Sequence, residues 1–174
     1  ANASDPILHG RGGVLRDCLF LLLIATLSVA PYVTRLGFYG DDWAILAALV
    51  NADDSSFRAM WDAQYEQSVN LQRRPTQILY QAVLFRASAL NPLGYHAVNA
   101  AVLFLAALFL YFIAREFDPR RVIAVAVAAV YILLPNYSTD RFWFAAFTYS
   151  LTTMLFLLGV YAFARAIRSG RPEG

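Results

Sequence analysis

The sequence predicts an all-α polytopic membrane protein with four transmembrane helices and amphipathic interfacial helices in a long first outer loop. Composition is the first observation, since 59% of the 174 residues are hydrophobic and only 15% are charged, with a mean hydropathy of +0.50. Four apolar runs are the second, because each is long enough to cross or nearly cross a hydrocarbon core about 30 Å thick. The placement of the arginines is the third.

The expected spans are residues 18–35, 95–114, 122–139 and 142–164, within a single membrane domain of residues 1–174. One set of span ends is rich in arginine, and the positive-inside rule assigns that set to the cytoplasm. Both tails, residues 1–17 and 165–174, are then cytoplasmic, and residues 36–94 form the outer loop. The arginines that define the cytoplasmic side are Arg11, Arg16, Arg115, Arg120, Arg121, Arg165, Arg168 and Arg171.

Charge and cysteine content exclude several classes of protein. The net charge is +2 and the arginines are dispersed, so no nucleic-acid partner is expected. Cys18 is the single cysteine, which excludes a disulfide framework and a cysteine metal cluster. All fourteen cations are arginine, a bias typical of a GC-rich genome, and together with the topology it predicts a multi-pass protein of a bacterial inner membrane.

The outer loop is where we expect function to lie. Its pattern predicts short helices over residues 43–50 and 57–67, with a polar turn at 51–56 between them. After Pro75, residues 76–90 show helical periodicity, and Arg86 interrupts their apolar run too early for a span. We therefore expect an interfacial helix there. Its predicted polar face carries Arg74, Gln77, Gln81 and Ser88, opposite Ile78, Leu79, Ala82, Val83 and Phe85.

Two adjacent acids, Asp41 and Asp42, lie where the first span should leave the bilayer. An ionised carboxylate beside hydrocarbon is costly unless it is paired, hydrated or used, so a catalytic or ligand-binding role is one interpretation. The other is structural, because Asp41 can cap a short helix over residues 42–50 and both acids favour its N-terminal dipole. The two interpretations are compatible.

The order of these parts resembles a known family. An acidic pair after the first span, an outer loop with Arg74-Pro75 separated by three residues from Leu79-Tyr80, and a following span that ends in arginine are similar to the N-terminal part of GT-C class membrane glycosyltransferases. The nearest groups are the protein mannosyltransferases and the lipid A aminoarabinose transferases. The resemblance covers about residues 15–168. It implies a polyprenyl-phosphate sugar donor, inverting transfer on the outer face to a lipid, glycan or protein acceptor, and a first-loop acid as base.

Carried to this sequence, the catalytic acids are Asp42 and Asp41, with Asp42 marginally preferred as the base. Adjacent carboxylates disfavour joint ionisation, which helps one of them to accept a proton from an acceptor hydroxyl. Arg73 or Arg74 would bind the lipid phosphate, since a guanidinium can bind its oxygens bidentately. Anchoring of Arg73 and Arg74 to membrane phosphates is the alternative.

Other candidate substrate-binding residues are Tyr80, Trp43, His96 and Asn99. Trp43 can stack on a sugar or a prenyl chain, as can Trp61, Tyr65, Trp143 and Tyr149, although an interfacial aromatic belt also explains such residues. His96 and Asn99 are three positions apart and share a helix face.

The sequence predicts no cofactor and no metal ligand set. A hard oxygen site for a divalent cation, made by Asp41, Asp42 and Asp140, remains open without any His or Cys spacing to accompany it. Asp140 and Arg141 read more simply as an ion pair in a turn. The alternative to an enzyme is a non-catalytic membrane subunit that binds a membrane lipid or a partner protein through the outer loop.

Overall fold

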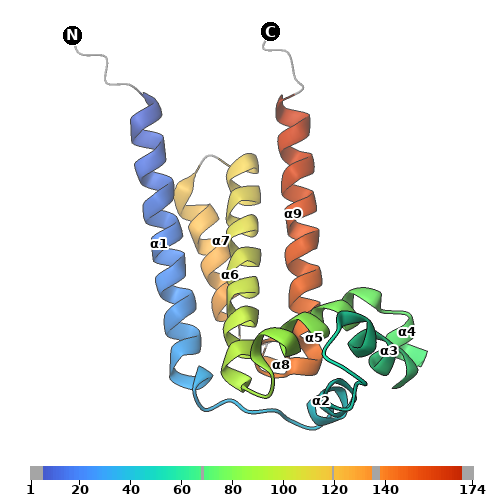
Figure 1. The fold of residues 1–174 in the computed structure, drawn as a ribbon. Helices are drawn as coiled ribbons and strands as arrows, with labels where there is room; N and C mark the ends of the chain where they lie inside the picture. Colours follow the sequence, from blue (N-terminus) through green and yellow to red (C-terminus); the bar gives the residue numbers. More distant parts are fainter. Residues whose placement is uncertain (1–5, 68, 119, 135–137, 170–174) are drawn as a thin grey trace, which may run out of the picture. The chain divides into compact units, whose positions relative to one another are not determined.

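The computed structural model describes residues 6–67, 69–118, 120–134 and 138–169, and this part of the chain is helical and contains no strand (Figure 1). The all-α prediction is therefore confirmed. The elements are α1 (Pro6–Val33), α2 (Asp42–Val50), α3 (Phe57–Gln67), α4 (Val69–Gln72), α5 (Pro75–Ser88), α6 (Pro92–Phe117), α7 (Arg121–Leu133), α8 (Ser138–Phe142), the 3-10 turn η2 (Phe144–Ala146) and α9 (Phe147–Ser169).

Three stretches are helical, long and apolar enough to cross a membrane, namely Gly12–Val33, Pro92–Phe117 and Phe144–Ser169. They correspond to the first, second and fourth expected runs and indicate a membrane protein. The third expected run, 122–139, forms α7, whose 13 residues are about 20 Å long. That length is less than a hydrocarbon core. Residues 135–137 of this run lie outside the described residues. That the run 122–139 also crosses the membrane, which would bring the number of spans to four, stays a prediction.

The chain forms two compact units. We call the first the bundle unit; its described residues are 6–31, 103–118, 120–134 and 153–169. We call the second the loop unit; its described residues are 32–67, 69–102 and 138–152.

Small side chains let the helices of the bundle unit approach closely. Its core contains residues from α1, α6 and α7, which run side by side in Figure 1. Alanines on α6 and α7 are fully buried there, as is typical where membrane helices pack without a hydrophobic driving force. The core residues are Leu21, Ala107, Tyr111, Ala124, Ala128 and Ile132.

A buried carboxylate joins the three helices of this core. Asp17 on α1 is 6% exposed. It accepts a 2.8 Å hydrogen bond from the Tyr111 hydroxyl, and Nε of Arg121 donates to its two oxygens at 2.6 and 2.8 Å. Asp17 was expected only as the last residue of a cytoplasmic tail. In the structure it forms an ion pair with Arg121, the first residue of α7.

A second group of charged side chains joins the end of α6 to α9. Glu116 accepts a 2.8 Å bond from Arg168 and lies 3.5 Å from Arg165, both on α9. Together with the bond between Asp17 and Arg121, these contacts bring several of the predicted cytoplasmic arginines to one end of the bundle unit. The side of the membrane that this end faces stays a prediction.

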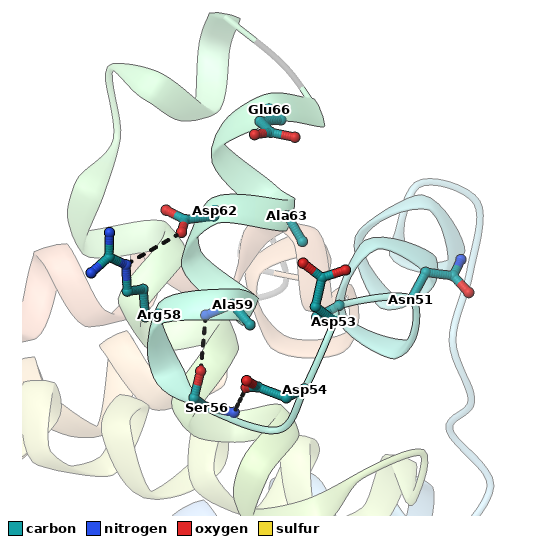
Figure 2. Close-up of a pocket in the computed structure, with 10 residues that line it drawn as sticks. Asn51, Asp53, Asp54, Ser56, Arg58, Ala59, Asp62, Ala63 and Glu66 are labelled. Atoms are coloured by element: carbon teal, nitrogen blue, oxygen red, sulfur yellow. Dashed lines mark hydrogen bonds and ion pairs between the residues drawn. The ribbon is translucent and has the colours of Figure 1, made fainter.

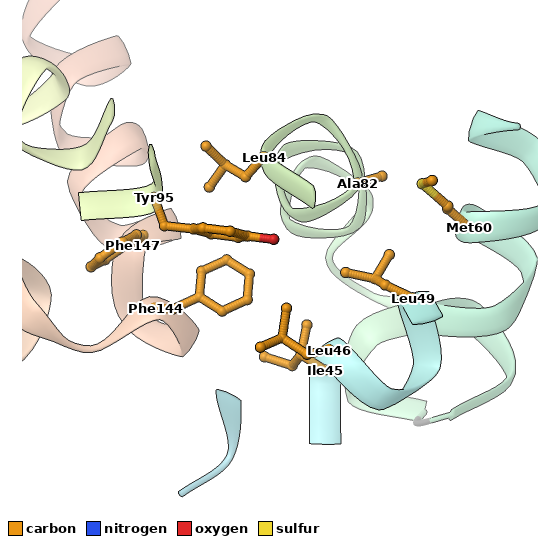
Figure 3. Packing of buried hydrophobic residues seen from close by; sticks show 9 residues of the cluster. All are labelled: Ile45, Leu46, Leu49, Met60, Ala82, Leu84, Tyr95, Phe144 and Phe147. Carbon is orange, nitrogen blue, oxygen red and sulfur yellow. The ribbon is translucent and has the colours of Figure 1, made fainter. Parts of the chain in front are cut away.

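The loop unit has its own apolar core, shown in Figure 3. Side chains from α2, α3 and α5 pack there against aromatic rings from α6, η2 and the start of α9. The rings of Tyr95 and Phe144 meet edge to face with their centroids 4.8 Å apart. α2 and α3 occupy the ranges 42–50 and 57–67, beside the predicted 43–50 and 57–67, and their place in an outer loop stays a prediction. The core residues are Ile45, Leu46, Leu49, Met60, Ala82, Leu84, Tyr95, Phe144 and Phe147.

The face assignment of α5 is wrong. Gln77 and Gln81, expected on an outward polar face, are buried, whereas Leu79 and Val83 are 52% and 44% exposed. α5 packs against α3, and Nε2 of Gln64 on α3 donates a 3.3 Å bond to the main-chain oxygen of Ile78, whereas the buried Gln81 amide makes no hydrogen bond within the described residues. The exposed positions of this helix therefore include apolar side chains beside the charged Arg86.

Candidate functional site

A glycine turn delivers the two acids to the start of α2. Gly40 has a φ of +48°, in the left-handed region that glycine adopts without strain. Asp41 then occupies the N-cap position with helical dihedrals, φ −65° and ψ −18°, and its side chain makes no capping hydrogen bond. The interpretation of Asp41 as a side-chain cap is therefore wrong, because a capping residue needs an extended backbone to aim its oxygen at the first turn.

Asp42 is fully buried and both of its oxygens are occupied. Oδ2 accepts a 2.8 Å bond from the Tyr39 amide, and Oδ1 accepts a 2.8 Å bond from the Ala145 amide of η2. Burial raises the pKa of Asp42, and the backbone amides and the nearby His96 only partly oppose that effect. With these partners, Asp42 acts as a tie between the turn before α2 and the turn before α9.

His96 and Asn99 are also ties within the loop unit. Nε2 of His96 lies 3.2 Å from the main-chain oxygen of Gly37. The amide nitrogen of Asn99 donates to the main-chain oxygens of Asp140 at 2.7 Å and Arg141 at 3.3 Å. Both side chains are almost fully buried. The structure thus brings His96 close to Asp42, but with a role in holding the chain segments that precede α2 and η2.

Asp41 has the opposite environment. Its exposed side chain lines a pocket of about 440 Å³ together with Arg74, and we call this the Asp41 pocket. Arg74 immediately precedes Pro75, the first residue of α5, so the pocket joins the starts of two helices. The aromatic side chains of Trp143 and Tyr149 line it as well. The other lining residues are Ala44, Ile45, Gln67, Leu71, Gln77, Ala145 and Ala146.

A second pocket of about 500 Å³ adjoins the first through Trp143, which lines both. Its lining is mainly apolar and includes Leu36 and Phe142, with Tyr39, Gly40 and Thr139 completing it. We call it the apolar pocket. A carboxylate, a guanidinium, aromatic faces and an apolar cavity therefore occur in adjoining parts of the loop unit.

The remaining predicted residues lie outside these two pockets. Arg73 is exposed and lines neither. Trp43 is 56% exposed and packs edge to face on Phe38 at 5.7 Å. The Tyr80 side chain packs against the loop-unit core, and burial raises its pKa to about 12, so its hydroxyl stays protonated at neutral pH.

An acidic pocket of about 340 Å³ was not predicted (Figure 2). It lies between the turn at residues 51–56 and α3, and its acids are Asp53, Asp54, Asp62 and Glu66. The hydrogen bonds from Ser56 lower the pKa of Asp54. Within the described residues no group of three His, Cys, Asp or Glu side chains could hold a metal ion, so Asp41, Asp42 and Asp140 do not form the oxygen site considered above.

Comparison with known proteins found no matching family model, no matching curated protein and no matching solved structure. The fold and the pockets define the class, an all-helical membrane protein whose loop unit carries an acid and an arginine in one pocket. The chemistry of that pocket is the basis for a functional proposal.

Proposed function

We propose that the chain is a GT-C-like membrane glycosyltransferase, or its N-terminal module, which transfers a sugar from a polyprenyl-phosphate donor with inversion. One observation carries the proposal: Asp41 and Arg74 line the same pocket, with Trp143 and Tyr149 beside them. Such a set matches the needs of the reaction, which are a base, a cation for phosphate and aromatic surfaces for a sugar ring.

Asp41 is the better candidate for the base. Its carboxylate is exposed and has no hydrogen-bond partner within the described residues, whereas both Asp42 oxygens are held by main-chain amides. In the proposed step the acceptor hydroxyl oxygen attacks the anomeric carbon, and its proton passes to Asp41. The bond from the anomeric carbon to the phosphate oxygen breaks, and the phosphate takes the electron pair. Asp42 positions Asp41 by tying down the turn beside it.

Arg74 is the proposed ligand of the leaving phosphate. A guanidinium forms charge-assisted bonds to phosphate oxygens, and Pro75 fixes the backbone directly after it. The apolar pocket offers a place for the first prenyl units, since it adjoins the Asp41 pocket at Trp143. The acceptor, whether lipid, glycan or protein, would approach from the exposed side of Asp41.

The topology that accompanies this function has four spans, with α7 as the third, and cytoplasmic termini in a bacterial inner membrane. We propose that α5 lies in the outer interface. Its exposed apolar side chains, Leu79 and Val83, support that position, because an interfacial helix buries such a face in the acyl boundary. The same apolar face favours the second candidate function, a non-catalytic subunit that binds a partner helix or lipid there.

Photo-crosslinking to a polyprenyl-phosphate probe tests the proposal, with the protein in lipid nanodiscs. Arg74→Ala is expected to reduce labelling about tenfold, the value of one charge-assisted bond to phosphate. Arg73→Ala is the matched control, since Arg73 is the adjacent exposed arginine outside the pocket. It should change labelling less than about twofold. Asp41→Asn should retain labelling, because it removes negative charge next to the phosphate.

Equal losses for Arg73→Ala and Arg74→Ala would indicate anchoring to membrane phosphates instead. Absence of labelling above a phospholipid control would favour the subunit function. In that case, replacement of Leu79 and Val83 by serine should disrupt assembly with a partner, while Asp41→Asn should leave that assembly unchanged.

A further inference from the structure

Two side-chain amides line the Asp41 pocket beside its charged groups. Gln67 comes from α3 and Gln77 from α5. Nε2 of Gln67 donates a 2.9 Å bond to the main-chain oxygen of Ala44, which orients the amide and leaves Oε1 as an acceptor. Gln77 is only 7% exposed, and its amide has no hydrogen-bond partner within the described residues. The pocket wall therefore carries both a donor and acceptors that a bound molecule can use.

The charges of the pocket restrict what that molecule can be. Among the described residues that line it, Asp41 is the only carboxylate and Arg74 the only guanidinium. In the proposed reaction Asp41 receives a proton and Arg74 binds phosphate. An ammonium group on the sugar would then lack a carboxylate of its own, and a sugar carboxylate would lack a second cation. An unpaired charge in such a site carries a desolvation cost that amides and aromatic rings offset poorly.

We propose that the Asp41 pocket takes a neutral sugar, whose hydroxyls are read by Gln77 and Gln67, and discriminates against amino sugars and uronic acids. This inference rests on the proposed function, which supplies the roles of Asp41 and Arg74. Each amide can donate to one hydroxyl and accept from another, while Trp143 and Tyr149 cover the C–H face of the ring. Gln77 is the principal specificity-determining residue, because burial leaves its amide with little water to lose.

Binding of farnesyl phosphate and of farnesyl phosphosugars to the protein in nanodiscs tests this inference. The probes carry mannose, 4-aminoarabinose or glucuronic acid. Wild type should bind the mannose probe about tenfold more tightly than the other two. Gln77→Leu should weaken the mannose probe about three- to tenfold, the value of one or two neutral hydrogen bonds, and leave farnesyl phosphate binding unchanged. The unchanged phosphate affinity also shows that the variant is folded.

Two further variants sharpen the result. Gln77→Glu adds a carboxylate to the same wall and should turn the preference toward the 4-aminoarabinose probe. Gln72→Leu is the control, because Gln72 is an exposed glutamine outside the pocket whose amide donates to the main-chain oxygen of Tyr65. It should bind all probes as wild type does.

Similar affinities of wild type for the mannose and 4-aminoarabinose probes would overturn the inference, as would a Gln77→Leu variant with unaltered mannose affinity. The proposed function would survive either result if farnesyl phosphate still bound through Arg74. Failure of wild type to bind farnesyl phosphate would overturn both.

Discussion

The two units each bury an aspartate, and they do so in opposite ways. Asp17 in the bundle unit meets a guanidinium and a phenol hydroxyl, so its charge is balanced by another side chain. Asp42 in the loop unit meets two main-chain amides and no side-chain hydrogen-bond donor within the described residues, so its hydrogen bonds come from the backbone. The first arrangement cross-links three helices. The second specifies the path of the backbone, which is what a pocket built from turns requires.

Loss of the Asp17 carboxylate should have the largest effect on stability. Asp17→Ala removes the bonds to Arg121 and Tyr111 and leaves the fully buried Tyr111 hydroxyl unpaired. We expect a loss of about 3 kcal/mol, at the low end for a broken buried pair because the Arg121 side chain is 45% exposed. Unfolding in mixed micelles with increasing SDS measures it.

A double-mutant cycle sharpens this expectation. Asp17→Leu combined with Arg121→Met leaves no unpaired charge. The double variant should therefore lose less stability than the sum of the two single losses. Simple additivity of the two single losses would mean that the aspartate and the arginine stabilise the bundle unit separately.

Neutralising Asp42 should have a smaller effect with a characteristic pH dependence. Asp42→Asn keeps one acceptor but turns an NH2 group toward a main-chain amide, at a cost of about 1 to 2 kcal/mol. Burial raises the pKa of Asp42 above its usual 3.8. The wild-type carboxyl therefore contributes its full stabilisation at a pH below the usual pKa. This stabilisation is lost as the pH rises through the raised pKa of the folded protein. The cost of the substitution should shrink as the pH rises above the usual carboxyl pKa of 3.8.

Asp41→Asn serves as the control for this measurement, since it disturbs neither amide bond to Asp42. Its effect on the free energy of unfolding should stay within about 0.5 kcal/mol. A cost of Asp42→Asn that grows toward neutral pH would show that the ionised carboxylate is the favoured form, and would make the two buried aspartates alike.

The smallest effect is expected at the exposed end of the bundle unit. The arginine partners of Glu116 are 64% and 66% exposed, so Glu116→Gln should cost about 0.5 kcal/mol or less. The cost should fall further at high salt. A salt-independent loss above about 2 kcal/mol would place this cluster in the same class as Asp17.

Local signals predicted the short helices well. The polar turn at residues 51–56 marked the end of one short helix and the start of the next, and α2 ends at Val50 and α3 begins at Phe57. The partners of Asp42 could not be predicted in the same way. Its bonds go to main-chain amides, and the one at Ala145 lies 103 positions away without any side-chain signal.

The sequence also did not predict which face of a helix is buried where that depends on a neighbouring helix. Gln77 and Gln81 are buried although they are polar, on a helix that packs against α3, and no pattern within α5 itself indicates that neighbour. The sequence contained a signal for the pairing of Asp17, because an acid lies at the start of an apolar run. The residues around Asp17 do not indicate that Arg121 is its partner. The resemblance named Asp41 and Arg74 among its candidates; both line one pocket, and their roles stay a prediction.

The hydrogen bond between Asp42 and Ala145 can form only after a long part of the chain has been synthesised. Chains grow at about 5 to 20 residues per second, so the 103 positions between the two residues take roughly 5 to 20 seconds to synthesise. During that interval the carboxylate has no η2 amide to bind, and the last walls of the Asp41 pocket do not exist. A ribosome that stalls before residue 145 therefore leaves a chain with its first helices made and its pocket unfinished.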